Sequence, residues 1–180
     1  ARTAVSGKNI GVAGGIGPLG ITADEAAARG SDRAACFGAQ IAALAEGGVD
    51  VLFFETFMDF DEMEIALRRK SELTDIPAIA SFACAAEGRL ASGVLIGEAF
   101  ARAQELGAAI VGANCMNGPH AMVQLLECVP ASFITAAYAN AGYPKYHDGR
   151  FIYYTAPDYF AGAAREMVAQ GARLTGGGLG

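Results

Sequence analysis

Short apolar runs alternate with longer stretches of helical period along most of the chain. The runs are rich in residues that favour β-strands, and the Ala-rich stretches between them repeat apolar positions every three or four residues. Six runs predict strands, at Asn9–Gly14, Asp50–Glu55, Ala78–Cys84, Ala108–Cys115, Phe133–Tyr138 and Ala172–Gly176. Five stretches predict helices, at Asp32–Glu46, Phe60–Glu72, Gly93–Leu106, His120–Cys128 and Pro157–Gln170.

This alternation is typical of an α/β protein with a parallel sheet, and continuous apolar strands predict that helices cover both faces of the sheet. An open sheet can use six strands, whereas a closed (β/α)8 TIM-type barrel needs two more. The chain begins with Ala1 and ends on G-G-G-L-G directly after a strand. We therefore expect a (β/α)8 TIM-type barrel, incomplete in this chain, with residues 1–180 as a single domain truncated at both ends. The alternative is a complete open sheet.

Composition narrows the classes of partner. The 180 residues are 53% hydrophobic and 18% charged, with a formal net charge of −6 and no cluster of lysine or arginine. This balance favours a small-molecule substrate and argues against nucleic acid or a membrane surface as the main partner. The four cysteines are widely spaced, and no apolar run reaches the length of a membrane helix. We expect a cytoplasmic protein whose open sheet edges are covered by a missing barrel half, a further module or a homo-oligomer.

The stretch from Ile110 to Pro119 carries the first candidate chemistry. It is an apolar run that stops at Asn114 and Cys115 and passes into a Gly-Pro turn. The carboxyl ends of parallel strands open onto the active-site face of such folds, so both side chains are predicted to lie where chemistry takes place. A cysteine at this position can be a metal ligand, a nucleophile or a small buried apolar residue.

The predicted strand ends together resemble those of the homocysteine S-methyltransferase family. The resemblance covers nearly the whole chain, matches the family barrel from its third to its eighth strand, and rests on segments that follow one another in the family's order. The segments are A-G-G-I-G-P at 13–18, D-V-L-F-F-E-T at 50–56, S-F-A-C at 81–84 with G-R-L-A-S-G at 88–93, V-G-A-N-C-M-N-G-P at 111–119, Y-A-N-A-G-Y-P at 138–144 and G-A-R-L-T-G-G-G-L-G at 171–180.

The resemblance implies transfer of a methyl group to the thiol of homocysteine, which forms methionine. In that family three cysteine thiolates hold Zn²⁺, which turns the substrate thiol into a thiolate. Cys115 matches the first of these ligands and would be both the catalytic and the metal-binding residue. Glu55 matches the carboxylate that receives the ammonium group of the substrate. Ser81, Asn114 and Asn140 are further candidates for substrate binding.

One departure from the family pattern concerns the metal. The family's last strand ends in G-G-C-C-G, but here Gly178 and Leu179 stand in place of the two cysteines, and neither side chain can ligate zinc. Cys84 and His120 are the neighbours that could form a makeshift site. We therefore expect that this chain does not retain zinc as its relatives do.

Two other functions stay open at this point. A non-catalytic module could use the same pocket to bind an amino acid or a thiol. An enzyme similar to aspartate/glutamate racemases would use Cys84 and Cys115 as paired acid and base, because G-V-A-G-G-I-G-P-L-G resembles the opening of that family. The methyl donor cannot be assigned from the residues, because its recognition would depend on other regions or modules.

Overall fold

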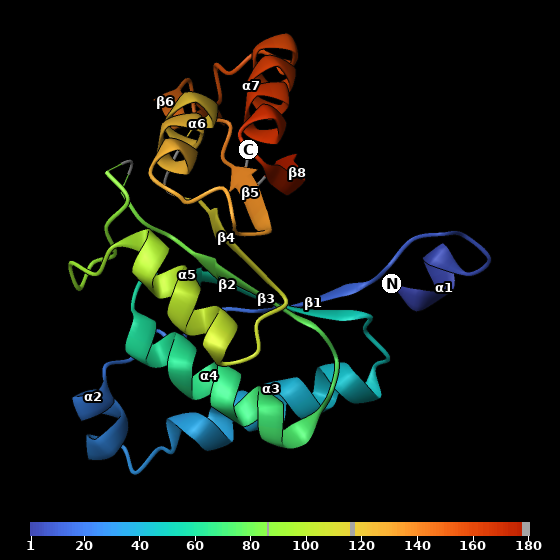
Figure 1. Cartoon of the computed structure of the whole chain (residues 1–180), viewed down its shortest axis with the longest axis vertical. Helices are drawn as coiled ribbons and strands as arrows, with labels where there is room; N and C mark the ends of the chain where they lie inside the picture. The colour runs from blue at the N-terminus through green and yellow to red at the C-terminus, as the bar shows by residue number, and fades with distance from the viewer. Residues whose placement is uncertain (86, 116–117, 178–180) are drawn as a thin grey trace.

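Six parallel strands form a curled sheet in the computed structural model of the chain, which describes residues 1–85, 87–115 and 118–177 (Figure 1). The strand order is β1-β2-β3-β4-β5-β8, with consecutive strands paired in parallel. The curl and the alternation with helices confirm an incomplete (β/α)8 TIM-type barrel. The strands of this sheet are β1 (Ala13–Ile16), β2 (Val51–Phe57), β3 (Ala78–Phe82), β4 (Ile110–Asn114), β5 (Thr135–Ala139) and β8 (Ala172–Gly177).

Five helices pack against the outer side of this sheet, namely α3 (Arg33–Glu46), α4 (Phe60–Leu73), α5 (Ile96–Glu105), α6 (Pro119–Glu127) and α7 (Pro157–Ala169). Two short helices come before them, α1 (Arg2–Val5) and α2 (Ala23–Ala28), and α1 projects away from the sheet without a buried residue (Figure 1). Several helices start where the sequence supplies an N-terminal signal. The side chains of Asp32 and Asp59 cap α3 and α4, and proline occupies the first turn of α6 and α7.

The main core lies between the sheet and the helices. Leu52 and Phe54 of β2 point into it and are fully buried, whereas Phe53 and Glu55, which alternate with them, are only partly buried. The same alternation places Val111 and Ala113 of β4 in this core. For the described residues, the prediction of helices on both faces is therefore wrong, because the inner face of the curled sheet lines a cavity instead.

Three features differ from the predicted elements. The first strand begins at Ala13 instead of Asn9, since its register with β2 starts at Ala13 opposite Val51, and Ile10 is left exposed. Helix α2 is an additional helix, held by a capping box between Thr22 and Glu25.

An antiparallel hairpin is the third difference. Among the described residues, strands β6 (Lys145–His147) and β7 (Arg150–Ile152) pair only with each other. Asp148 and Gly149 form their turn, both at positive φ, as an Asp-Gly hairpin turn requires. The sequence suggests a turn at this point but not the strands that flank it.

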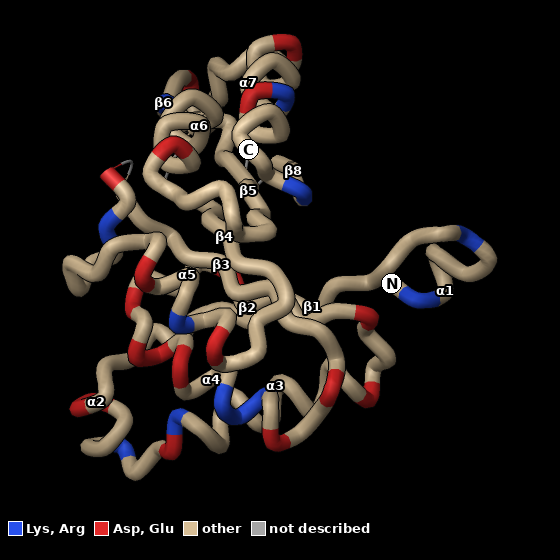
Figure 2. Tube along the Cα trace, in the orientation of Figure 1, with Lys and Arg blue, Asp and Glu red and all other residues tan. Residues whose placement is uncertain are grey.

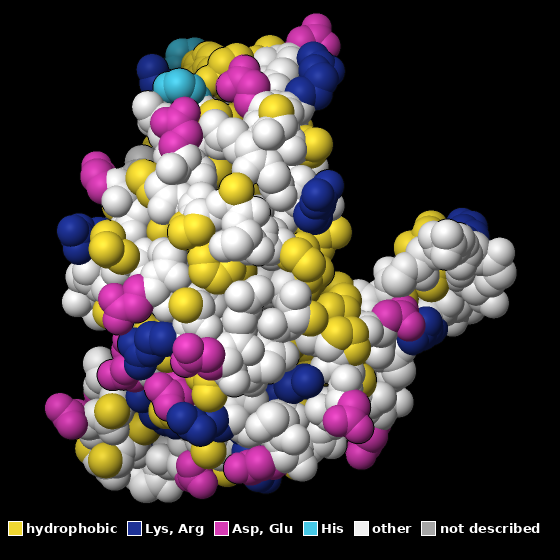
Figure 3. Space-filling model, in the orientation of Figure 1, with side chains coloured by type: hydrophobic (Ala, Val, Ile, Leu, Met, Phe, Trp, Pro, Cys, Tyr) yellow, Lys and Arg dark blue, Asp and Glu magenta, His cyan; other side chains and the backbone are white. Residues whose placement is uncertain are grey.

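Charged residues lie along the helices and loops and are nearly absent from the six-stranded sheet (Figure 2). On the face shown in Figure 3, side chains of both signs lie next to one another over the helices in the lower left of the view. The pairs of Glu64 with Arg68 and Arg102 belong to this kind of surface. Within the described ranges, none of the helices has the length and apolar character needed to cross a membrane.

Candidate functional site

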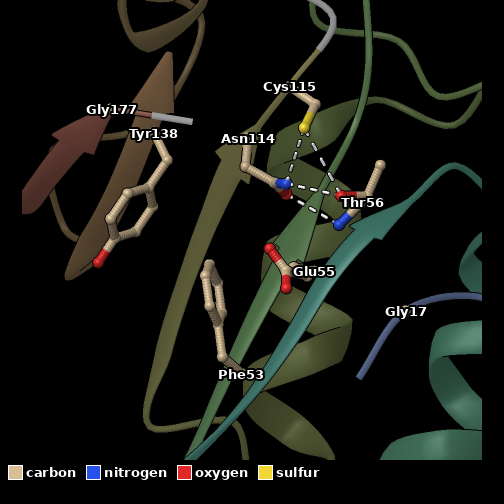
Figure 4. Close-up of a pocket in the computed structure, with 8 residues that line it drawn as sticks. All are labelled: Gly17, Phe53, Glu55, Thr56, Asn114, Cys115, Tyr138 and Gly177. Carbon is tan, nitrogen blue, oxygen red and sulfur yellow. Dashed lines mark hydrogen bonds between the residues drawn. The ribbon is translucent and has the colours of Figure 1, made fainter. Parts of the chain in front are cut away.

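A cavity of about 560 Å³ opens at the carboxyl ends of the strands, on the inner face of the curled sheet (Figure 4). Two successive residues of β2, Glu55 and Thr56, contribute polar groups, and Asn114 and Cys115 do so at the end of β4. The complete lining of described residues is Gly17, Phe53, Glu55, Thr56, Asn114, Cys115, Tyr138 and Gly177.

A β-bulge explains why two neighbouring residues of one strand both reach the cavity. The pairing of β2 with β3 shifts between Phe54 and Phe57, and Thr56 has a φ of 67°. The extra residue returns Phe57 to the buried outer face, so Glu55 and Thr56 both face inward. A branched residue with positive φ is rare and needs surrounding contacts to hold it.

The side-chain amide of Asn114 supplies those contacts. Its Oδ1 accepts hydrogen bonds from the backbone N–H of Thr56 at 2.9 Å and from Ser81 Oγ at 2.8 Å. Its Nδ2 lies 2.8 Å from Thr56 Oγ1 and 3.4 Å from Cys115 Sγ (Figure 4). Asn114 is only 3% exposed, so a single buried amide connects the ends of β2, β3 and β4.

Cys115 follows the last residue of β4 and also has a positive φ, of 57°. Its N–H donates to the carbonyl of Tyr138 on β5, at 3.2 Å. The half-buried thiol faces the cavity, where Thr56 Oγ1 lies 3.7 Å from its sulfur. Both donors near the sulfur, the Thr56 hydroxyl and the Asn114 amide, can therefore direct a proton toward it.

Glu55 places a carboxylate in the same cavity. No hydrogen bond or ion pair joins it to another residue in the described part of the chain. Gly15 of β1 leaves the necessary space, because a Cβ there would come within 2.8 Å of Glu55 Oε1. The lining contains no lysine or arginine among the described residues, so the negative charge of Glu55 is available to a ligand.

Two aromatic rings form an apolar wall beside this carboxylate. The rings of Phe53 and Tyr138 lie with their centroids 5.3 Å apart and tilted by 47°. Burial raises the pKa of the Tyr138 hydroxyl, so this ring remains neutral at physiological pH. The cavity thus combines an anionic group, an apolar wall and a polar sulfur-bearing end.

The predicted substrate-binding residues lie at the carboxyl ends of adjacent strands, but they have different surroundings. Glu55 and Asn114 line the cavity. Ser81 is fully buried and faces Asn114 instead of the cavity. Asn140 follows β5 directly and is not among the lining residues; its Oδ1 is buried and has no hydrogen-bond partner within the described residues.

Sequence reasoning did not select Thr56, Phe53, Tyr138 or Gly17. Phe53 could have been found from strand alternation, because it shares a face with Glu55 two residues later. Strand alternation does not predict Thr56, since a regular strand would turn it toward the opposite face. The sequence hint of a bulge is the order of Glu55, Thr56 and Phe57, in which two polar residues come before the next core residue.

The residues present do not fit the zinc site that the family pattern implies. Within the described residues, no group of three or more His, Cys, Asp or Glu side chains is placed to hold a metal ion. Cys115 supplies a thiol to the cavity, whereas Cys84 and His120 are not part of its lining. Gly178 and Leu179 lie outside the described residues, and neither side chain has a donor atom.

Cys84 also does not suit the racemase alternative. It is 2% exposed within the core, and burial, together with the nearby Cys128, raises the pKa of its thiol to about 12. A paired acid and base on opposite sides of a substrate must both reach that substrate. With Cys84 in the core and Cys115 in the cavity, the two thiols do not form such a pair.

Comparison with known proteins identifies relatives of the same architecture. A family model described as homocysteine S-methyltransferase matches residues 1–180. Among solved structures, the homocysteine methyltransferase MmuM from Escherichia coli is similar in its apo form, with a TM-score of 0.70, 22% identity, and coverage of 95% of this chain and 57% of that one. Its metallated form gives a TM-score of 0.69, 23% identity and the same coverage.

The chain therefore spans 57% of the length of these solved structures. The search of curated proteins finds no match. At this level of identity, the solved structures establish the fold, and the match to the family model establishes family membership.

Proposed function

Because the chain belongs to the homocysteine S-methyltransferase family, we propose that its cavity binds homocysteine and that the protein transfers a methyl group to the homocysteine thiol. The product would be methionine. One observation carries the proposal, namely that the Glu55 carboxylate and the Cys115 sulfur line the same cavity from the ends of two different strands. The proposed partner is a small molecule with a positive group at one end for Glu55 and, as the family implies, a thiol at the other.

The chemistry of homocysteine suits this arrangement. Its ammonium group can pair with Glu55, a partly buried carboxylate that has no partner in the described chain. An unpaired charge beside aromatic rings is costly, so an ammonium ligand gains from taking this position. The methylene groups would contact Phe53 and Tyr138, and the thiol would reach the end of the cavity formed by Thr56 and Cys115.

Methyl transfer needs a nucleophilic sulfur held in line with the methyl donor. The sulfur forms a bond to the methyl carbon while the bond between that carbon and the donor breaks, the electron pair of that bond leaves with the donor, and the thiol proton passes to solvent. A free thiol has a pKa of about 8.5, so contacts that favour its deprotonated form raise its reactivity at neutral pH. The chain's residues bind and orient the substrate, and no step is assigned to a metal, because the donor set does not fit one.

The proposed cellular compartment for this reaction is the cytoplasm. Cys36, Cys115 and Cys128 are free thiols. Free thiols and a thiol substrate both suit a reducing compartment, which supports a cytoplasmic location. We also treat residues 1–180 as one domain, because a single core cluster extends from Ile16 to Ala172.

The test of this function is the binding of homocysteine to wild-type chain and to Glu55→Gln, measured by calorimetry under reducing conditions. We expect the substitution to weaken binding by about 2 kcal/mol or more, the scale for losing a hydrogen bond to a charged group. Glu105→Gln is the matched control, since Glu105 is an exposed residue at the end of α5, outside the cavity lining. Equal affinities for wild type and Glu55→Gln would contradict the proposal.

A transfer assay separates an enzyme from a binding module. Homocysteine is incubated with the chain and with betaine or S-methylmethionine as methyl donor, and methionine is quantified. Formation above background that is lost in Glu55→Gln supports the methyltransferase. Binding that depends on Glu55 without methionine formation would favour the non-catalytic alternative, a conclusion consistent with the missing zinc ligands.

A further inference from the structure

The sulfur-binding end of the cavity contains hydrogen-bond donors where the family pattern implies metal ligands. How this end of the cavity would recognise a thiol is an inference that rests on the proposed function. Near the Cys115 sulfur, the polar groups are the Asn114 amide at 3.4 Å and the Thr56 hydroxyl at 3.7 Å. These groups can donate protons to a sulfur atom but are not the thiolates that hold zinc.

The orientation of the Asn114 amide follows from its partners. The backbone N–H of Thr56 can only donate, so the atom facing it at 2.9 Å must be the amide oxygen. This places Nδ2 toward Thr56 Oγ1 and Cys115 Sγ. With Ser81 Oγ as the second donor to Oδ1, the amide has two partners on each of its ends and no unused capacity.

The Thr56 hydroxyl differs from the amide, because one of its contacts is weak. Its oxygen accepts a hydrogen bond from Asn114 Nδ2 at 2.8 Å, which leaves its own proton to point elsewhere. That proton is directed at Cys115 Sγ over a long distance of 3.7 Å. Because the hydroxyl lines the cavity, its proton can turn toward a ligand sulfur at little cost.

We propose that Thr56 is a specificity-determining residue, whose hydroxyl donates a hydrogen bond to the ligand sulfur and thereby selects thiol-bearing amino acids without a metal ion. The bulge of β2 turns this side chain into the cavity, and Asn114 keeps it there. Glu55 recognises the other end of the ligand. The neighbouring residues Glu55 and Thr56 thus recognise the two ends of the same ligand, its ammonium group and its sulfur.

The experiment compares homocysteine with norvaline, in which a methyl group replaces the thiol. Calorimetry is performed on the full chain after dialysis against a chelator, with wild type, Thr56→Val and Thr56→Ser. Wild type is expected to prefer homocysteine about tenfold, the scale of one net hydrogen bond. Thr56→Val keeps the branched shape at the positive φ but should bring the ratio of affinities close to one, with norvaline affinity unchanged. Thr56→Ser should keep the preference.

Thr3→Val is the control, since Thr3 is exposed on α1 and outside the cavity lining. An unchanged preference in Thr56→Val, or wild-type affinities that are equal for the two ligands, would overturn the inference. If Thr56→Val does not fold, the inference is tested by the ratio of the homocysteine and norvaline affinities of the wild-type chain and by a zinc titration. A rise in homocysteine affinity of tenfold or more when zinc is added would show that a metal holds the sulfur.

These outcomes are distinct from those that test the proposed function. Homocysteine binding that depends on Glu55 but not on the Thr56 hydroxyl would leave the proposed function standing and refute the role of Thr56. Loss of the preference in Thr56→Val together with an intact Glu55 dependence supports both.

Discussion

Asn114 is the residue on which the geometry of the site depends. Its four hydrogen bonds reach Thr56, Ser81 and Cys115, which belong to the ends of three neighbouring strands. Two of these residues, Thr56 and Cys115, have positive φ. Backbone strain of this kind costs of the order of 1–3 kcal/mol for each residue and persists where surrounding contacts hold it. Asn114 was expected to bind substrate, but its described partners already use the whole amide.

Replacing Asn114 with alanine tests this role at the level of stability. The change leaves Ser81 Oγ and the Thr56 N–H without their acceptor, and we expect a loss of about 2–4 kcal/mol in the free energy of unfolding. Ser81→Ala removes one donor while Thr56 still pairs with Oδ1, so a smaller loss of about 1 kcal/mol is expected. Urea denaturation of the three proteins provides the measurement. An Asn114→Ala variant as stable as wild type would contradict the role.

At the scale of the elements, the close approach of β4 and β5 depends on a glycine. Gly112 lies opposite Ala136 in the register of these strands, and an added Cβ would collide with the backbone carbonyl and the Cβ of Ala136. Both strands carry cavity residues at their ends, Asn114 on β4 and Tyr138 on β5. The shape of the cavity is therefore sensitive to this contact.

A pair of glycine substitutions tests the strand contact. Gly112→Ala is expected to destabilise the chain by about 1–3 kcal/mol, the usual range for overpacking. Gly162→Ala, within α7, meets no atom within 4 Å and is expected to stabilise by about 0.5–1 kcal/mol, as glycine is unfavourable inside a helix. Thermal unfolding of both variants is the measurement. A Gly112→Ala variant with an unchanged midpoint would show that the strands can separate without cost.

The pattern of apolar residues predicts most of the strands and helices, but not all of them. Strands β2 to β5 and β8 could be predicted because each is an apolar run, and helices α3 to α7 because their apolar positions repeat regularly. The start of β1 was wrong, since Ile10 continues the apolar run but has no strand beside it. The hairpin of β6 and β7 was missed because its exposed side chains follow no buried pattern.

The site could be predicted only in part. Glu55, Asn114 and Cys115 were found because polar residues interrupt apolar strands at their carboxyl ends. The inward rotation of Thr56 depends on the pairing of β2 with β3, and this contact joins residues more than twenty positions apart. Ser81 was recognised as polar in a strand, but whether it faces a ligand or a neighbouring amide is a matter of packing.

At the scale of the whole molecule, the described sheet has central strands and two edge strands, β1 and β8. β3 and β4 each have a strand on both sides and helices above them, whereas β1 and β8 have a described neighbour on one side only. Strand edges of this kind offer unpaired backbone groups to another chain or segment. We expect local stability to fall from the centre of the sheet to these two edges.

Hydrogen exchange of the backbone amides measures this gradient. The amides of Ala78–Phe82 and Ile110–Asn114 should exchange most slowly, and those of Ala13–Ile16 and Ala172–Gly177 considerably faster. A repeat at several protein concentrations serves as the control. Protection of β1 and β8 that grows with concentration indicates self-association through the edges, and equal protection of edge and centre in dilute solution would contradict the expected gradient.

The hairpin of β6 and β7 has a consequence for how such a protein can diverge. Within the part of the chain that the structure describes, its strands pair only with each other, so its length and composition do not enter the register of the six-stranded sheet. It nevertheless begins a few residues after Asn140, at the rim where β5 ends. Insertions and deletions there would change the segment after β5 while the cavity residues Asn114 and Cys115 keep their positions. Evolution can thus vary this surface segment independently of the residues that line the site.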